Sequence, residues 1–111
     1  MENCIFCLIV NKTLPSDKVF EDDSFIIIKD KYPKAPVHLL VIPKKHLDSL
    51  SQADSADKDL LGGLLLLVKA HAKAIGVAEN GYKVTINVGS DGGQTIPHLH
   101  IHLKAGKKFE E

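Results

Sequence analysis

The segment His98-Leu99-His100-Ile101-His102-Leu103 alternates histidine with aliphatic residues. Because side chains alternate across a β-strand, this pattern predicts a strand over Leu99–Leu103, with the three histidines on one face about 6.6 Å apart from one to the next. The aliphatic side chains then point into a core on the other face. A lone histidine in a protein core usually serves only to form a hydrogen bond, but this role does not explain three histidines on one face of a strand. Since imidazole is nucleophilic and titrates near neutrality, the pattern indicates a site that attacks phosphorus or transfers protons.

A glycine-rich segment, Gly89-Ser90-Asp91-Gly92-Gly93-Gln94-Thr95, lies just upstream of these histidines. Glycines allow backbone N–H groups to turn inward and cradle an anion, and Gln94 and Thr95 add an amide and a hydroxyl. Taken alone, the segment fits a plain turn equally well. Because it leads into the histidine strand, it predicts an oxyanion site that faces a nucleophile.

The remaining sequence is typical of a small α+β fold with an antiparallel sheet. We expect a short helix over residues 6–14, closed by Pro15, and a hairpin between the first two strands, since Asp22-Asp23-Ser24 is turn-forming. The polar residues 104–111 predict a frayed C-terminal tail. The expected strands are Lys18–Glu21, Phe25–Lys29, His38–Ile42, Tyr82–Val88 and Leu99–Leu103.

The longest helix is expected over residues 56–75, with Asp54 or Ser55 as its N-cap and Gly76 as its terminator. Its apolar stripe is wider than one helix face, which is explained either by deep burial or by packing against a second subunit. The pair Gly62-Gly63 lowers helix propensity, and a close approach of another backbone would account for it. The stripe consists of Leu60, Leu61, Leu64, Leu65, Leu67, Val68, Ala72 and Ile75.

Composition restricts the class of protein. The 111 residues fit one domain over 1–111, and 14 basic residues balance 14 acidic ones. A net charge of zero argues against broad binding to nucleic acid or to an anionic membrane. The N-terminus lacks the pattern of a signal peptide, so we expect a cytoplasmic protein.

Several stretches together resemble the histidine triad (HIT) family, whose motif is His-φ-His-φ-His-φ-φ, and within it the bacterial, zinc-containing type of the nucleoside phosphoramidase branch. The glycine-rich segment and the histidines at 98–103 carry the motif. Cys4-Ile5-Phe6-Cys7, Val19–Asp23 and Ala35–His46 extend the match over nearly the whole chain. The resemblance implies a HIT-like fold with a five-stranded antiparallel sheet, one long helix and one short helix. It also implies a homodimer with a continuous ten-stranded sheet.

The resemblance implies a role for each of four histidines. His100 is the nucleophile that attacks the α-phosphorus of a nucleoside phosphoramidate or related AMP conjugate. The resulting nucleotidyl-histidine intermediate is then hydrolysed. His102 binds phosphate and assists proton transfer, while the backbone carbonyl of His98 accepts a hydrogen bond from His100. His38 borders the same site.

The resemblance also implies a purine nucleotide site. Asp30 accepts hydrogen bonds from the ribose hydroxyls, although a solvated charge at a strand end would also explain it. The apolar base-pocket positions are equally compatible with plain core packing. The positions that match are Asn87, Gly93, Gln94 and Thr95 for the phosphate or leaving group, and Ile5, Phe6 and Ile28 for the base.

The chain departs from the family pattern in two places. Gly-Gly-Arg often follows the third histidine in the family, whereas here Leu103 is followed by Lys104-Ala105-Gly106-Lys107. In related proteins the C-terminal tail shapes the leaving-group pocket, so the leaving-group preference stays open. Ile28 and Lys31 also replace an aromatic and an aliphatic residue near the base.

The pair Cys4-x2-Cys7 has the spacing of half a zinc site. Some bacterial members of the family complete such a pair with two histidines, which match His46 and His98 here. Two thiolates and two imidazoles suit a closed, tetrahedral, structural zinc ion. We therefore hypothesise one zinc ion that fastens the N-terminal segment to the sheet, with no cofactor needed for the chemistry. The alternative is a pair of reduced, buried cysteines.

Three other functions stay open. A zinc hydrolase with His98, His100 and His102 as ligands is disfavoured, because on a straight strand the outer pair lies about 13 Å apart. A second possibility is a non-catalytic nucleotide-binding or scaffold module. The third is a dinucleoside polyphosphate hydrolase of the same family.

Overall fold

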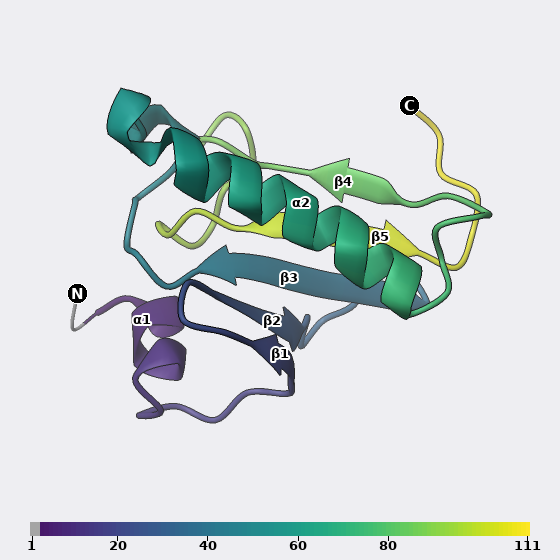
Figure 1. Ribbon diagram of the computed structural model, residues 1–111, viewed down its shortest axis with the longest axis horizontal. Helices are drawn as coiled ribbons and strands as arrows, with labels where there is room; N and C mark the ends of the chain where they lie inside the picture. The colour runs from purple at the N-terminus through teal and green to yellow at the C-terminus, as the bar shows by residue number, and fades with distance from the viewer. Residues whose placement is uncertain (1–2) are drawn as a thin grey trace.

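The computed structural model describes residues 3–111. Five strands form one sheet in the order β1-β2-β3-β5-β4, and every neighbouring pair is antiparallel (Figure 1). The predicted α+β fold with a five-stranded antiparallel sheet and one long helix is confirmed. The elements are α1 (Ile5–Val10), β1 (Lys18–Glu21), β2 (Phe25–Lys29), β3 (Val37–Pro43), the 3-10 turns η1 (Leu50–Gln52) and η2 (Ser55–Asp57), α2 (Lys58–Ala74), β4 (Lys83–Thr85) and β5 (Ile101–Ala105).

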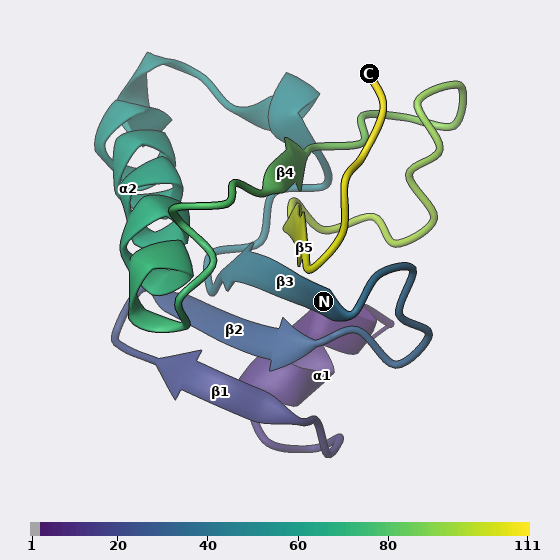
Figure 2. The same ribbon diagram turned by 90° about the vertical axis from the view of Figure 1, so that its right-hand side faces the viewer.

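The sheet separates two apolar layers, with α2 on one face and α1 on the other (Figure 2). On β3, Leu39 and Val41 pack in the α2 layer, while Leu40 and Ile42 pack in the α1 layer. The central strands are covered on both faces, which is why they appear in the sequence as continuous apolar runs instead of alternating ones.

Helix α2 ends just before the predicted terminator Gly76, but its start is shifted. Asp54 caps the turn η2 in a capping box, so residues 55–57 form a 3-10 turn and the α-helix begins at Lys58 instead of residue 56. Gly76 follows the helix with a φ of 82°, as expected of a glycine terminator. Within residues 3–111, no helix is long and apolar enough to cross a membrane.

The glycine pair in α2 has different surroundings at its two positions. A Cβ on Gly63 would lie 3.3 Å from the ring of Phe25, whereas a Cβ on Gly62 would meet nothing within 4 Å. The close approach at Gly63 comes from a side chain of the same chain, and the approach of another backbone to the glycine pair stays a prediction.

Three further elements have boundaries that differ from the predicted ones. Helix α1 ends at Val10 instead of residue 14, because the N–H of Asn11 bonds back to the carbonyls of Cys7 and Ile9 and Lys12 turns left-handed with φ 68°. Strand β4 covers only three of the seven predicted residues. Strand β5 begins at Ile101, since the N–H of Leu99 bonds to the carbonyl of Leu47 in a loop.

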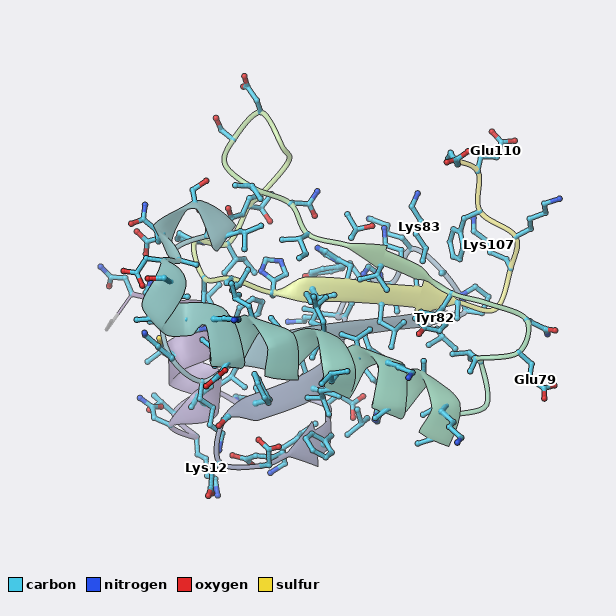
Figure 3. All side chains as sticks on the ribbon, turned by 45° about the horizontal axis from the view of Figure 1, so that its top comes forward. Lys12, Glu79, Tyr82, Lys83, Lys107 and Glu110 are labelled. Carbon is cyan, nitrogen blue, oxygen red and sulfur yellow. The ribbon has the colours of Figure 1, made fainter. Side chains whose placement is uncertain are left out.

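The C-terminal segment is more ordered than its polarity predicts. Lys104 and Ala105 belong to β5, and Ala105 is fully buried. Further on, two ammonium groups lie near the ring of Phe109: Lys83 Nζ is 5.9 Å and Lys107 Nζ is 5.3 Å from the ring centroid. Figure 3 shows both lysines beside the end of the chain. The frayed tail predicted over 104–111 is thus corrected for its first two residues.

Candidate active site and metal cluster

The three histidines of the motif lie on the α1 face of the sheet. The ring of Phe6 contacts His98 and His100 edge-on, at centroid distances of 5.7 and 5.1 Å, and the rings of His100 and His102 lie 5.0 Å apart. The intervening residues Leu99, Ile101 and Leu103 are buried in the α2 layer. The alternation in the sequence therefore extends from β5 back through residues 98–100.

His100 has one ring nitrogen engaged and one free. Its Nδ1 lies 2.7 Å from the backbone carbonyl oxygen of His98, as the resemblance implies. Because a carbonyl only accepts, the proton is on Nδ1 and the lone pair is on Nε2. Burial lowers the pKa of His100, which favours this neutral form. No group among residues 3–111 forms a hydrogen bond with Nε2, so its lone pair is available to a ligand.

A second group of side chains adjoins His100. His38 Nε2 lies 2.9 Å from His102 Nδ1 and 3.3 Å from Asp30 Oδ2. The other nitrogen of His38 accepts the backbone N–H of Lys34 at 2.9 Å. Burial, with the neighbouring histidines and Lys104, lowers the pKa of His102 to about 4. The structure thus brings three predicted site residues together: His38 on β3, His102 on β5 and Asp30 just after β2.

The glycine-rich loop is held in shape by the residues predicted to touch phosphate. The amide of Gln94 donates to the carbonyls of Asp48 (2.6 Å) and Ile96 (3.0 Å), and its oxygen accepts from Gly89 N–H. Asn87 donates to the carbonyl of Gly92 at 2.7 Å. These amide side chains build the loop, and their contact with a ligand stays a prediction.

Two other loop residues have different surroundings. Gly93 has a φ of 82°, the left-handed region that favours glycine, and Thr95 is exposed. A Cβ on Gly92 would lie 2.3 Å from the carbonyl oxygen of Val88, so only glycine fits this tight turn.

The predicted base-pocket residues differ in exposure. Phe6 and Ile28 are buried in the α1 layer, whereas Ile5 is 48% exposed. A hollow of about 290 Å³ has Ile9 and Leu14 in its lining, and none of the three predicted base-pocket residues lines it. The role of Ile5, Phe6 and Ile28 in binding a base stays a prediction.

Four side chains from separate parts of the chain converge in a cluster that could hold a metal ion. Cys4 Sγ lies 3.2 Å from His98 Nδ1, Cys7 Sγ lies 3.2 Å from His46 Nδ1, and the two Nδ1 atoms lie 3.1 Å apart. All four donor atoms lie within 4.8 Å of one another. This is the set that the sequence predicts for zinc.

The outer nitrogens of the two rings show why a cation fits there. His98 Nε2 lies 2.8 Å from the carbonyl oxygen of Pro43, and His46 Nε2 lies 2.6 Å from Asp48 Oδ1. Each acceptor places the ring proton on Nε2, so both Nδ1 atoms direct lone pairs at the same point. Lone pairs 3.1 Å apart repel each other unless a proton or a metal ion lies between them.

The thiols fit the same interpretation. Without a cation, burial and the neighbouring Cys4 raise the pKa of the Cys7 thiol to about 11. A metal ion would favour the thiolates, as it does in zinc sites with two cysteines and two histidines. Pro43 and Asp48, which orient the two rings, were not singled out in the sequence, although Asp48 follows His46 by two residues.

Comparisons with known proteins show which family the chain belongs to. A family model described as "Scavenger mRNA decapping enzyme C-term binding" matches residues 3–110. An uncharacterised HIT-like protein of Chlamydia muridarum is 51% identical over 102 residues, which are 92% of this chain and 80% of that protein. The chain therefore belongs to the histidine triad family.

Solved structures of the family superpose closely on the chain. A HIT family hydrolase from Legionella pneumophila is 42% identical, with a TM-score of 0.94 over 96% of this chain and 95% of that one. A histidine triad protein from Clostridium difficile is 43% identical, with a TM-score of 0.96 over 100% and 96%. A zinc-bound family protein from Mycobacterium smegmatis is 28% identical, with a TM-score of 0.79 over 96% and 76%.

Proposed function

We propose that the protein is a nucleotide-binding hydrolase that cleaves nucleoside 5′-phosphoramidates or related AMP conjugates. The observation that carries this proposal is the state of His100, a neutral ring anchored through Nδ1–H with a free lone pair on Nε2. Such a nitrogen can attack phosphorus at neutral pH without first losing a proton. The hydrolase described from Legionella pneumophila supports the class of reaction.

The reaction proceeds in two displacements. In the first, the lone pair of His100 Nε2 forms a bond to the α-phosphorus, and the P–N bond to the amine breaks with its electron pair on nitrogen. The amine takes a proton from water as it leaves. In the second, a water oxygen attacks phosphorus, the bond to Nε2 breaks, and its electron pair returns to the ring. The water gives up a proton to solvent, and a nucleoside monophosphate is released.

Around this centre, the family resemblance assigns Asp30 to the ribose hydroxyls of a purine nucleotide. The Asp30 carboxylate is partly exposed and beside His38, where a ribose could reach it. The N–H groups of Gly93 and Gln94 are engaged within the loop, so the phosphate oxygens would be received by other backbone N–H groups of the loop and by the exposed Thr95. The assignment of Ile5, Phe6 and Ile28 to the base belongs to the same proposal.

A comparison of substrates tests this function against its relative within the family. We expect wild-type protein to hydrolyse adenosine 5′-phosphoramidate with a higher kcat/KM than diadenosine polyphosphates, assayed side by side by chromatography. A higher kcat/KM for the diadenosine compounds would reassign the enzyme to the dinucleoside polyphosphate hydrolases. Nucleotide binding without turnover of either substrate would favour a non-catalytic module.

We also propose that Cys4, Cys7, His46 and His98 hold one structural zinc ion. The converging lone pairs and the zinc-bound relative from Mycobacterium smegmatis support it. When bound, the ion would fasten α1 to the loop before β5. A hydrolytic zinc held by the triad itself is disfavoured. Among the described residues, two groups could hold a metal ion, the cysteine–histidine cluster and Asp30 with His38 and His102, and neither includes His100.

A homodimer is part of the proposal, built through the β4 edge of the sheet. At the opposite edge, β1 carries the ion pair Lys18–Glu21, whose carboxylate also pairs with Lys44, and such charges discourage strand pairing. Strand β4 instead exposes Val84, and α2 exposes Leu65 (53%) and Leu66 (67%). A second copy would cover these apolar side chains and continue the sheet to ten strands.

Two matched substitutions test the dimer. We expect light scattering at micromolar concentration to give two chains for wild type and one chain for Val84→Lys, because a lysine on an edge strand blocks pairing. Val19→Lys is the control, since Val19 is as exposed on β1 as Val84 is on β4 (40% and 41%). It is expected to stay dimeric. A monomeric wild type would refute the dimer. A monomeric Val19→Lys would show that the interface involves the β1 edge and not the β4 edge alone.

A further inference from the structure

His38 and His102 belong to a chain of hydrogen bonds whose direction is fixed at its first member. The backbone N–H of Lys34 can only donate, so His38 Nδ1 is an acceptor and carries no proton. A neutral His38 therefore has its proton on Nε2. That N–H faces His102 Nδ1 at 2.9 Å and Asp30 Oδ2 at 3.3 Å. Consequently His102 Nδ1 also accepts, and a neutral His102 has its proton on Nε2.

This chain of hydrogen bonds has no position for an additional proton. A proton on His38 Nδ1 would face the N–H of Lys34, and a proton on His102 Nδ1 would face the N–H of His38. The surroundings act in the same direction: burial, His100, His38 and Lys104 disfavour a charged His102, while Asp30 alone favours it. Both rings are therefore held neutral.

The same hydrogen bonds make this group a poor metal site. Asp30, His38 and His102 present donor atoms within 4.8 Å of one another, as the cysteine cluster does. However, a neutral histidine that binds a metal through Nε2 must carry its proton on Nδ1, and Lys34 N–H occupies that side of His38. In the cysteine cluster, Nε2 of each histidine donates a hydrogen bond, so Nδ1 has a lone pair that faces the metal position. In His38, Nδ1 accepts a hydrogen bond, so the nitrogen that faces the group, Nε2, carries a proton and has no lone pair for a metal.

We infer that His38 is a positioning residue that holds His102 as a neutral ring, so that His102 Nε2–H donates a hydrogen bond to a phosphoryl oxygen without passing its proton to the leaving group. A neutral imidazole that gave up this proton would become an imidazolate. His38 cannot resupply the proton, because the Lys34 amide at the start of the chain does not release one. This role is narrower than the proton transfer implied by the resemblance, and it rests on the proposed function.

The tautomers can be measured in the ligand-free protein by long-range ¹⁵N–¹H NMR at neutral pH. We expect His102 to have a protonated Nε2 and a bare Nδ1 in wild type. His38→Phe, which keeps a ring but removes the donor, should give averaged nitrogen signals for His102. His71→Gln is the control, since His71 lies on α2 and contacts Phe20 instead. A doubly protonated His102, or one protonated on Nδ1, in wild type would overturn the inference.

Kinetics with two leaving groups test the role in catalysis. One substrate is adenosine 5′-phosphoramidate, whose amine must gain a proton, and the other is the 4-nitrophenyl ester of AMP, whose leaving group needs none. We expect His102→Phe to slow both reactions by a similar factor, about 10²- to 10³-fold, as for the loss of an oxyanion donor. His102→Gln should recover part of both rates through its amide N–H. A loss confined to the phosphoramidate would identify His102 as a proton donor and overturn the inference.

The two proposals can fail separately. If wild type hydrolysed neither substrate, the hydrolase assignment would be wrong, while the NMR tautomers would still decide the state of His102. If wild type were active but its His102 were protonated on Nδ1, the hydrolase assignment would stand and the inference about His38 would be rejected.

Discussion

Replacing His100 with alanine should lower kcat for adenosine 5′-phosphoramidate by roughly 10⁴-fold or more, with nucleotide affinity changed by no more than about threefold. The lost Nε2 is the atom that would form the bond to phosphorus, and solvent water is a far weaker nucleophile in the same site. Steady-state assays give kcat, and calorimetry with AMP gives the affinity. The rest of the proposed pocket, including Asp30 and the glycine loop, is unchanged by the substitution.

Two controls separate chemistry from folding in this experiment. His71→Ala removes another partly buried histidine, which packs on Phe20 on the α2 side of the sheet, and it should keep wild-type kcat. Thermal unfolding of His100→Ala would show whether the variant is folded at the assay temperature, since the ring packs on Phe6. Equal turnover by a folded His100→Ala and wild type would be fatal to the nucleophile assignment.

The parts of the fold that follow from local rules could be predicted from the sequence. Period-two alternation placed Leu99, Ile101 and Leu103 in the core and the histidines on the other face, and Gly76 marked the end of α2. The boundaries that failed depend on contacts distant in sequence. Leu99 pairs with Leu47 in a loop, so the regular ladder of β5 starts two residues later than the alternation suggests.

The resemblance implies the hydrogen bond that fixes the proton on His100, but the protonation states of His38 and His98 could not be predicted from the sequence. The proton on each of these two rings is set by a backbone group whose position only the fold determines. The N–H of Lys34 fixes His38, and the carbonyl of Pro43 fixes His98. Neither Lys34 nor Pro43 has a side chain that signals this role. These two backbone groups distinguish the hydrogen-bond chain from the metal cluster.

Loss of the metal cluster is the second large effect that we expect. Wild-type protein purified without a histidine tag should contain about one zinc ion per chain, by elemental analysis. Cys7→Ser should lose most of that zinc and should lower Tm by about 10 °C or more, because a structural zinc site contributes several kcal/mol to the folded state of a chain this small. Cys7 is a better target than Cys4, whose sulfur also caps α1 by accepting the N–H of Cys7.

A chelator provides the matched comparison for Cys7→Ser. Stripping the metal from wild type should lower its Tm toward that of the variant, whereas the same treatment should leave the variant unchanged, because both act on one site. Zinc well below one ion per chain in wild type would reject the site. An equal loss of Tm in both proteins would show that the chelator acts elsewhere.

Activity of the stripped protein tells a structural zinc from a catalytic one. Assayed well below its Tm, stripped wild type should still hydrolyse the phosphoramidate, because the nucleophile is the His100 ring and no metal ligand takes part in bond breaking. The cluster nevertheless reaches that ring: the peptide of His98 accepts His100 Nδ1–H, and the side chain of His98 belongs to the cluster. A moderate fall in kcat with KM unchanged is therefore expected, whereas complete and zinc-reversible loss in a folded protein would assign the metal to the chemistry.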